Sequence, residues 1–383
     1  MSFSLANISK FFSSAVGSKS EASIIGIDIG ASSAKVVQLR ASRGRAVLET
    51  YGEISLGPYG GVAIGKAVKL TAEKISEALL DLMREANVTS RSGGLSIPFS
   101  ASLVSVLEMP KVDKDSLKRM VPIEARKYIP LPASEVTLDW FAIPSGEHGE
   151  SAFDQVEEPK VSHAKMQEIL LVAIHNEILR DYQKVAESSA IEVNFYEIEI
   201  FSATRSSMGH GTAPVLVVDL GAATTKMYIV ERGVVRLTHL LTMGGQHMTD
   251  TLARSLTWEF EKAERVKREI GLIASSAYSI DENDKIKTAL LSTLSRVFSE
   301  IDRVLLSYGQ RYNKNVSHVL LTGGGASLPG ISEYAKQTLH ADVEIANPFS
   351  HTEVPAFLKD VLKQIGPGFA VSVGLALRDL KQE

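Results

Sequence analysis

A short segment that occurs twice constrains this chain of 383 residues more than any other feature. Residues 24–30 read IIGIDIG and residues 215–221 read VLVVDLG, so that each copy is a buried-strand pattern ending in Asp-x-Gly. Small or hydroxyl residues follow, then a lysine seven positions after the aspartate (Lys35 and Lys226), then a second apolar run. Because the two copies lie half a chain apart, the repeat predicts two like halves that share one cleft.

The chemistry that suits such a segment is phosphate binding. Two strands joined by a tight turn of Gly, Ser and Thr present backbone N–H groups to an anion, because small residues let the backbone come close. An aspartate at the strand end supplies hard oxygen for hydrated Mg²⁺. Either segment alone would be read as an ordinary hairpin, but two copies at matched spacing favour a nucleotide site. The expected phosphate contacts are Gly30, Ser32, Ser33 and Lys35 from one copy and Gly221, Thr224 and Thr225 from the other, with Asp28 and Asp219 facing a metal through water.

A third element of the predicted site is a triple-glycine turn. Residues 319–331 read VLLTGGGASLPGI, which predicts a buried strand, a turn and the start of a helix. Backbone without side chains at Gly323, Gly324 and Gly325 could lie flat against a base or a ribose.

A Gly-Gly turn that ends at Gly245 leads into a helical stretch expected over residues 247–270. Glu264 and Lys267 stand at i, i+3 on one face of that helix. Alone they would be a solvated surface pair, but between phosphate-like segments they become candidate ribose contacts.

Residues 60–67 contain a sequence that resembles a P-loop. They read GGVAIGKA and so match G-x-x-x-x-G-K, but Ala67 stands where a Ser or Thr would hold Mg²⁺. The segment follows a Gly/Pro-rich turn and not a buried strand. We therefore predict an ordinary loop here.

Composition excludes several other functions. Lys and Arg number 41 against 45 Asp and Glu, which gives no basic field for nucleic acid. The absence of cysteine excludes disulfide scaffolds, thiol nucleophiles and thiolate metal sites. The nine histidines show no metal-ligand spacing. Apolar runs have strand length, well below the roughly 18 residues of a membrane span, so the sequence favours a cytoplasmic protein.

The three glycine-rich segments, in this order, resemble the phosphate and adenosine motifs of the actin-like ATPase superfamily, which includes actin, FtsA and DnaK-type chaperones. Four further stretches are similar to the PilM family of type IV pilus assembly proteins: LEMP at 107–110, IEARKYIPLP at 123–132, EVTLDW at 135–140 and VGLALR at 373–378. The resemblance extends over about residues 23–380. It implies an α/β, actin-like ATPase fold with two ribonuclease-H-like halves and an FtsA-type inserted subdomain.

The resemblance also implies a domain organisation. A flexible N-terminal arm, with some apolar residues that could touch a membrane, precedes the fold. The expected parts are residues 1–22 for the arm, 23–108 with 191–213 and 367–383 for the first half, 109–190 for the inserted subdomain, and 214–366 for the second half, with a helical insert at about 244–313.

In function, the resemblance implies a cytoplasmic scaffold that binds ATP and Mg²⁺ at the inner face of the cytoplasmic membrane. Its partner would be the cytoplasmic N-terminal peptide of the inner-membrane protein PilN, and it would join the pilus machinery to its motor ATPases. Two alternatives stay open: a filament-forming or FtsA-like cell-division protein, which would self-associate, and a sugar kinase or ATPase on the same fold. No aspartate stands in a recognisable kinase substrate context.

Glu199 is the candidate for the residue that faces the water beside the γ-phosphate, and its neighbour Glu197 is a second, weaker one. The family often has proline directly after this glutamate, whereas here the next residue is Ile200. Slow or no ATP hydrolysis is therefore expected.

A short apolar peptide gains affinity by filling a groove or extending a sheet edge. We expect such a groove between the first half and the inserted subdomain, where the family-specific stretches concentrate. The residues expected to contact the partner peptide are Val104, Val106, Leu107, Met120 and Tyr128.

Overall fold

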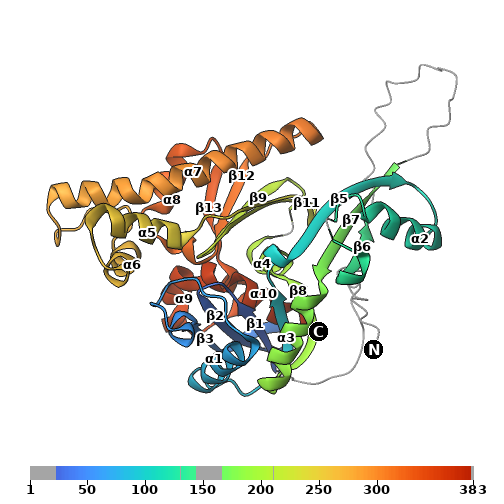
Figure 1. The fold of residues 1–383 in the computed structure, drawn as a ribbon, viewed down its shortest axis with the longest axis horizontal. Coiled ribbons are helices and arrows are strands. Elements are labelled where there is room, and N and C mark those ends of the chain that lie inside the picture. Colours follow the sequence, from blue (N-terminus) through green and yellow to red (C-terminus); the bar gives the residue numbers. More distant parts are fainter. Residues whose placement is uncertain (1–22, 130, 144–165, 210, 381–383) are drawn as a thin grey trace. The chain divides into compact units, whose positions relative to one another are not determined.

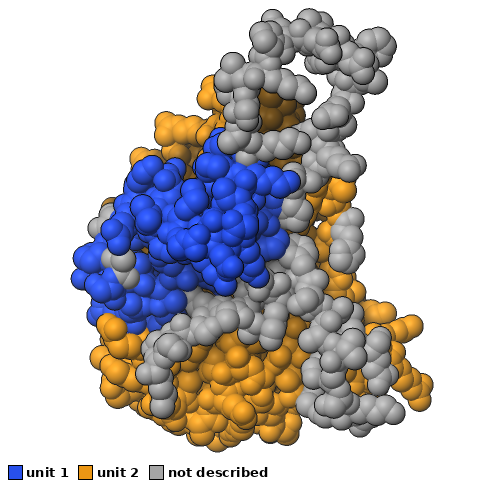
Figure 2. Space-filling view, turned by 90° about the vertical axis from the view of Figure 1, so that its right-hand side faces the viewer, with its two compact units in different colours: residues 1–18, 101–179 blue, residues 19–100, 180–383 orange. Residues whose placement is uncertain are grey.

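A computed structural model describes residues 23–129, 131–143, 166–209 and 211–380 of the chain (Figure 1). The expected N-terminal arm, residues 1–22, lies outside the described residues. The chain forms two compact units, coloured separately in Figure 2. The larger consists of residues 19–100 and 180–383, and the smaller contains residues 101–179. Among the described residues, no helix is both long and apolar enough to cross a membrane.

The larger unit contains two sheets, and five strands of each have a corresponding order and direction. In the first sheet the order is β14-β3-β2-β1-β4-β8, with β1, β2 and β3 antiparallel and β4 and β8 parallel to β1. In the second it is β11-β10-β9-β12-β13, with the same directions. The first sheet comprises β1 (Ser23–Ile29), β2 (Ser33–Ser42), β3 (Arg45–Ser55), β4 (Ser92–Ile97), β8 (Glu192–Ile198) and β14 (Thr352–Glu353). The second comprises β9 (Val215–Leu220), β10 (Thr225–Glu231), β11 (Val234–Leu241), β12 (His318–Thr322) and β13 (Asp342–Ile345).

Helices close the core around each sheet. Around the first sheet lie α1 (Ala72–Glu85), α4 (Glu199–Ser207), α9 (Lys359–Ile365) and α10 (Ala370–Asp379), and α10 contacts β1, β2 and β4. In the hydrophobic core of the first sheet, Ile24, Val37 and Leu39 pack with residues from far along the chain, such as Phe349 and Val373. The second core is formed by its sheet together with α5 (Gly245–Leu256), α6 (Phe260–Glu269), α7 (Ile280–Tyr312) and α8 (Ile331–Thr338).

The single helix expected over residues 247–270 is wrong, because the chain forms two helices there. Thr257 ends α5 in the left-handed conformation, with φ of 52°, and α6 begins at Phe260. Between them the Trp258 side chain packs against the second core, and the backbone N–H of Trp258 donates to the Ala253 carbonyl at 2.8 Å. Neither glycine nor proline marks this break, so the sequence carried no signal for it.

The smaller unit has a core of its own. A three-stranded antiparallel sheet with the order β5-β7-β6 packs against α2 through residues such as Leu107, Val121 and Ile169. Its elements are β5 (Ser102–Pro110), α2 (Lys114–Ala125), β6 (Val136–Ala142) and β7 (Met166–His175), and α3 (Asn176–Ser188) leads from it into the larger unit.

Candidate functional site

The repeated segments fold into two hairpins with the same register. Asp28 lies opposite Lys35 across β1 and β2, and Asp219 lies opposite Lys226 across β9 and β10. In both turns the glycine N–H donates to the carbonyl three residues later: Gly30 to Ser33 and Gly221 to Thr224, each at 3.0 Å. The sequence repeat is thus a repeat of geometry as well.

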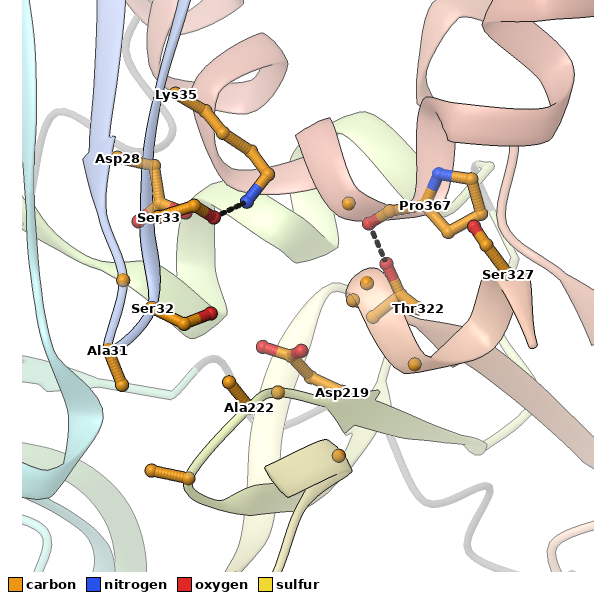
Figure 3. Close-up of a pocket in the computed structure, with 18 of the residues that line it drawn as sticks. Asp28, Ala31, Ser32, Ser33, Lys35, Asp219, Ala222, Thr322, Ser327 and Pro367 are labelled. Carbon is orange, nitrogen blue, oxygen red and sulfur yellow. Dashed lines mark hydrogen bonds between the residues drawn. The ribbon is translucent and has the colours of Figure 1, made fainter. Parts of the chain in front are cut away.

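The two turns and the triple-glycine turn line one pocket of about 430 Å³ in the larger unit (Figure 3). This volume is within the range of pockets that hold small-molecule ligands. Among the residues predicted for nucleotide and metal, Thr225 alone is absent from the lining, because it is fully buried and its hydroxyl donates to the Met243 carbonyl at 2.8 Å. The lining includes Asp28, Gly30, Ser32, Ser33, Lys35, Glu199, Asp219, Gly221, Thr224, Gly245, Glu264, Lys267, Gly323, Gly324 and Gly325.

The glycines of the triple-glycine turn have different surroundings. Gly323 has φ of +79°, and a Cβ there would collide with the Asp219 carboxylate, so this residue permits the close approach of β12 to β9. Its backbone N–H donates to the Pro367 carbonyl at 2.9 Å. The Thr322 hydroxyl donates to the same carbonyl at 3.1 Å (Figure 3). Gly324 is different, because a Cβ there would meet open space.

A buried ion-pair network occupies the middle of the pocket wall. The Lys226 Nζ lies 2.5 Å from Glu199 Oε2 and 3.0 Å from Asp219 Oδ2. The other oxygen of Glu199, Oε1, accepts the Phe99 N–H at 2.7 Å. Burial raises the pKa of Glu199, whereas the pKa of Lys226, which burial alone would lower, is raised by Asp219 and Glu199.

Asp28 has a different environment. Its Oδ1 accepts the Ser96 hydroxyl at 2.8 Å, and burial raises the pKa of this carboxyl group. No cation among the described residues forms a hydrogen bond with it, and a buried carboxylate of this kind fits a hydrated Mg²⁺, which would supply a balancing charge. Asp219 fits the metal less well, because its Oδ2 is already paired with Lys226.

Glu264 and Lys267 form the ion pair that their spacing predicted, at 2.6 Å. The three donors of Lys267 have three acceptors in the chain: Glu264, the Thr249 hydroxyl at 2.9 Å and the Gly245 carbonyl at 3.1 Å. Glu264 also accepts from Thr249 and Arg268. With three of roughly four lone-pair sites used, the carboxylate keeps one acceptor position for a ligand hydroxyl.

Glu197 does not line the pocket. Its buried carboxylate accepts two bonds from Arg205, both at 2.8 Å, one from Arg378 at 2.7 Å and one from the Ser202 hydroxyl. These residues belong to α4 and α10, so Glu197 ties the C-terminal helix to β8. It is a structural residue, and Glu199 alone of the two faces the pocket.

The segment that resembles a P-loop is a loop, as predicted, but it borders the same pocket. Gly65 lines the cavity and has φ of +87°, and a Cβ there would touch the Glu264 side chain. The Ala67 N–H donates to the Gln246 side chain at 2.7 Å. The loop is thus part of the pocket rim without the phosphate-binding geometry of a P-loop.

Sequence reasoning did not include several other lining residues in the site. Lys226 was part of the repeat but was not named as a site residue. Glu53 was missed because only the pairing of β2 with β3 brings it to Lys35, at 3.2 Å. Pro367 and Gly368 also line the pocket, but nothing local in the sequence indicated that this segment contacts the glycine turn.

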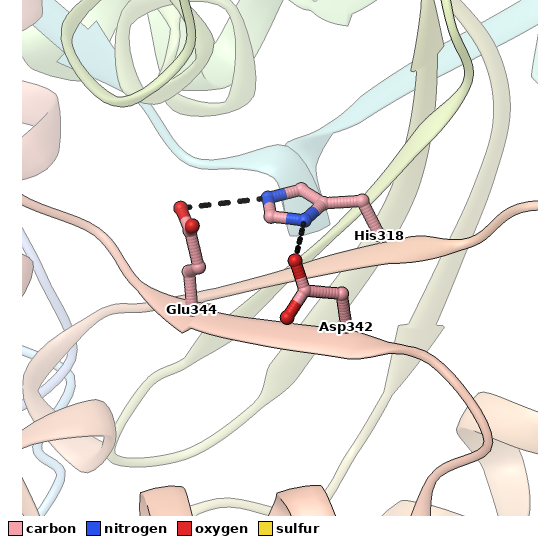
Figure 4. A group of neighbouring side chains, drawn as sticks. All are labelled: His318, Asp342 and Glu344. Atoms are coloured by element: carbon pink, nitrogen blue, oxygen red, sulfur yellow. Dashed lines mark ion pairs between the residues drawn. The ribbon is translucent and has the colours of Figure 1, made fainter.

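His318, Asp342 and Glu344 form a separate cluster on β12 and β13 (Figure 4). The histidine Nδ1 lies 3.5 Å from Asp342 and its Nε2 lies 3.7 Å from Glu344, so the two carboxylates face opposite ring nitrogens. Both acidic side chains are largely exposed, at 74% and 64%. This arrangement suits a solvated ion cluster better than a set of ligands around one metal.

In the smaller unit, the residues predicted for the partner peptide differ in exposure. Val104, Val106 and Leu107 are buried, and Leu107 belongs to the core beneath α2. Met120 is half-buried, and Tyr128 is exposed at 46%. Near these two, Ile123 adds an apolar side chain that is 65% exposed.

A family model described as "Type IV pilus assembly protein PilM" matches residues 26–380. Cell division protein FtsA of Bacillus subtilis (strain 168) is 22% identical in an alignment of 355 residues that covers 85% of this chain and 78% of that protein. FtsA of Rhizobium meliloti (strain 1021) is 28% identical in an alignment of 180 residues that covers 42% of this chain and only 39% of that protein.

Two solved structures resemble the chain in fold. A chain of the "PilM-PilN type IV pilus biogenesis complex" superposes with a TM-score of 0.76, 23% identity and coverage of 94% of this chain and 99% of that one. MreB5 of Spiroplasma citri bound to ADP gives a TM-score of 0.51 at 12% identity, with coverage of 93% and 96%. These likenesses confirm the expected actin-like ATPase fold.

Proposed function

The chain belongs to the PilM family of type IV pilus assembly proteins, and from this we propose that it is an ATP-binding scaffold for pilus assembly. The observation that carries the proposal is the shared pocket, in which two hairpins of the same register face one cavity of about 430 Å³. The scaffold would work at the inner face of the cytoplasmic membrane, through a PilN-type partner, and would connect that partner to the pilus motor ATPases.

The phosphates would be held from both sides. Backbone N–H groups and hydroxyls of the turns at Ser32 and Thr224 would donate to phosphate oxygens, because such turns are suited to close anion approach. Mg²⁺, when bound, would neutralise phosphate charge, and Asp28 would hold it through water. The glycine turn at Gly324 and the carboxylate of Glu264 would contact the nucleoside.

The substitution Gly324→Leu tests this assignment. Because a Cβ at Gly324 meets open space in the pocket lining, the larger side chain should fill the nucleotide site without disturbing the fold. The matched control is Gly209→Leu, at an exposed glycine outside the lining that also has open space around its Cβ. Calorimetric titration with Mg-ATP should give binding for the control and none for Gly324→Leu. The proposal fails if the unmodified protein binds no adenine nucleotide at millimolar concentration.

We also propose that the smaller unit captures the apolar N-terminal peptide of the membrane partner. Met120 and Ile123 lie one turn apart on α2, and Tyr128 follows the end of that helix. Their partly exposed apolar side chains offer the kind of surface that binds an apolar peptide. Leu107 of β5 would support this surface from the core beneath α2, whereas the buried Val104 and Val106 lie on the other face of that strand.

A charge on the exposed part of this surface tests the partner site. Tyr128→Asp should abolish capture of a peptide with the partner's N-terminal sequence in a pull-down, whereas ATP binding should persist. Leu306→Asp is the control, because Leu306 is a 62% exposed apolar residue on α7 in the other unit. Peptide capture that survives Tyr128→Asp and Ile123→Asp together would place the partner interface elsewhere.

A further inference from the structure

Residues 57–67, which contain the sequence that resembles a P-loop, form a loop whose two ends are bonded to the turn between β1 and β2. The Leu56 N–H donates to the Ser32 carbonyl at 2.9 Å. The Val68 N–H, just after the loop, donates to the Ala31 carbonyl at 2.9 Å. The 57–67 loop therefore begins and ends at the first of the two turns proposed to bind phosphate.

The same loop also contacts the second half of the larger unit. The Ala67 N–H donates to Gln246 Oε1 at 2.7 Å, and Gln246 belongs to α5. Gly65 lies against Glu264 of α6, since a Cβ at this glycine would come within 2.7 Å of the carboxylate. Both Gln246 and Glu264 line the nucleotide pocket. One loop of the first half thus reaches two residues of the second half at the edge of the proposed site.

Gln246 completes a connection between the two phosphate turns. Its backbone N–H donates to the Ala222 carbonyl at 2.9 Å, in the turn between β9 and β10. Its side chain accepts from Ala67, and the next residue, Val68, donates to Ala31 of the other turn. Ala31 and Ala222 are labelled in Figure 3. The glutamine side chain therefore joins the turns that would hold the phosphates from both sides.

The rest of the 57–67 loop packs loosely on α6. A groove of about 540 Å³ lies between them, with apolar residues of the loop on one side and charged residues of α6 on the other. Ile64 is 57% exposed, and the Lys66 Nζ lies 5.3 Å from the centre of the Phe260 ring. A loop that packs around a hollow loses little buried apolar contact when it moves away. The loop can therefore separate from the second half without disrupting either core.

We infer that Gln246 is a positioning residue that fastens the 57–67 loop across the pocket and so couples the two phosphate turns. This inference rests on the proposed nucleotide site and specifies how that site retains its ligand, a nucleoside polyphosphate with Mg²⁺. A ligand whose phosphates contact both turns favours the fastened arrangement. Because such coupling is reciprocal, the fastened arrangement also favours the bound ligand. Release of the nucleotide then requires that the bond from Ala67 to Gln246 opens first.

The first experiment measures how fast a fluorescent ATP analogue leaves the protein in excess Mg²⁺ when unlabelled ATP is added. Gln246→Leu removes the acceptor and keeps a side chain of similar size. Dissociation should become roughly three- to tenfold faster, as expected for the loss of one hydrogen bond. The association rate should change by less than about twofold, because such losses act mainly on dissociation. The matched control is Gln310→Leu, at an exposed glutamine on α7, which should dissociate like the unmodified protein.

A second variant separates the bond from any direct contact of Gln246 with the phosphates. Ala67→Pro removes the donor, and Ala67 lies outside the pocket lining. It should speed dissociation as much as Gln246→Leu does, and the double variant should be no faster than either, because both changes remove the same bond. Additive effects, or faster release in Gln246→Leu alone or in neither variant, would overturn the inference while leaving the nucleotide site intact.

Hydrogen exchange tests the same inference in the unmodified protein. Backbone N–H groups in peptides that cover residues 57–70 should exchange more slowly when Mg-ATP is bound, because the bound nucleotide keeps the loop fastened. In Gln246→Leu this protection should be largely lost. Exchange in this segment that is the same with and without bound Mg-ATP would overturn the inference, even if neither variant folds. An unmodified protein that binds no adenine nucleotide would instead refute the proposed nucleotide site itself.

Discussion

Glu197 offers a direct test of how the C-terminal helix is held. Its carboxylate is 3% exposed and binds two arginines, Arg205 of α4 and Arg378 of α10. The substitution Glu197→Gln keeps the size of the side chain but removes the negative charge that both guanidinium groups contact. Removing one partner of a buried pair costs about 3–5 kcal/mol. Because the arginines are 22% and 19% exposed, water compensates part of the loss, and we expect about 3 kcal/mol.

The corresponding change in melting temperature follows from the size of the larger unit. About 290 residues belong to it, and unfolding entropy is roughly 2.1 cal/mol/K per residue, which gives about 0.6 kcal/mol/K. A loss of about 3 kcal/mol should therefore lower the melting temperature by about 5 °C. Differential scanning calorimetry measures this shift.

The control is Glu77→Gln, which breaks an ion pair of similar length on the surface. Lys74 and Glu77 are 2.7 Å apart, but their side chains are 50% and 53% exposed. Such pairs contribute about 0–1 kcal/mol, so the control should melt within about 2 °C of the unmodified protein. If Glu197→Gln also melts within that margin, the buried cluster does not anchor α10 and the reasoning is refuted.

Three further predictions follow from the same structure. Burial alone would raise the pKa of Glu197, but Arg205 and Arg378 hold this pKa below its usual value. The stabilisation by Glu197 is therefore complete above the unfolded pKa of about 4.3 and is lost as the pH falls through the lower folded pKa. The difference in melting temperature between Glu197→Gln and the unmodified protein should be full at pH 7 and should narrow below about pH 4. Phosphate release from ATP should stay well below the roughly 1 s⁻¹ of slow enzymes, because Lys226 and the Phe99 N–H already bind the two oxygens of Glu199. Rapid release that disappears in Glu199→Gln would contradict this prediction. Val106→Asp places a charge in the buried strand β5, so it should unfold the smaller unit, seen as proteolysis within residues 101–179, and not merely block the partner.

The sequence predicted the pocket well because its parts are local. Each hairpin is encoded by one continuous stretch, with a strand, small turn residues and a second strand, and its register follows from the turn. Gly323 also belongs to a continuous stretch of strand and glycine turn, so the sequence indicated it. The structure explains why glycine stands there, since only glycine tolerates both its positive φ and the nearby Asp219. Local patterns of this kind carry their own geometry.

What the sequence did not predict depends on contacts between distant segments. Glu197 and Glu199 are two residues apart and looked alike, but their roles diverge because Arg378 reaches the first and Lys226 the second. The strand β14 joins the first sheet beside β3, although residues 352–353 follow the second sheet in the chain. The end of α5 at Thr257 likewise depends on where Trp258 packs.

The core of the first sheet also bears on how the chain reaches its native state. Ile24, Val37 and Leu39 are among the first described residues, whereas Phe349, Leu362 and Val373, which complete their packing, come more than 300 residues later. Contacts of such high sequence separation slow folding, because a long loop must close before they form. During synthesis the first half could therefore not complete its core, and its apolar strand surface would stay exposed. The second half is continuous over residues 215–345 and could fold as soon as these residues leave the ribosome. The two halves have corresponding sheets but would thus fold at different times, and the half that is synthesised first would complete its core last.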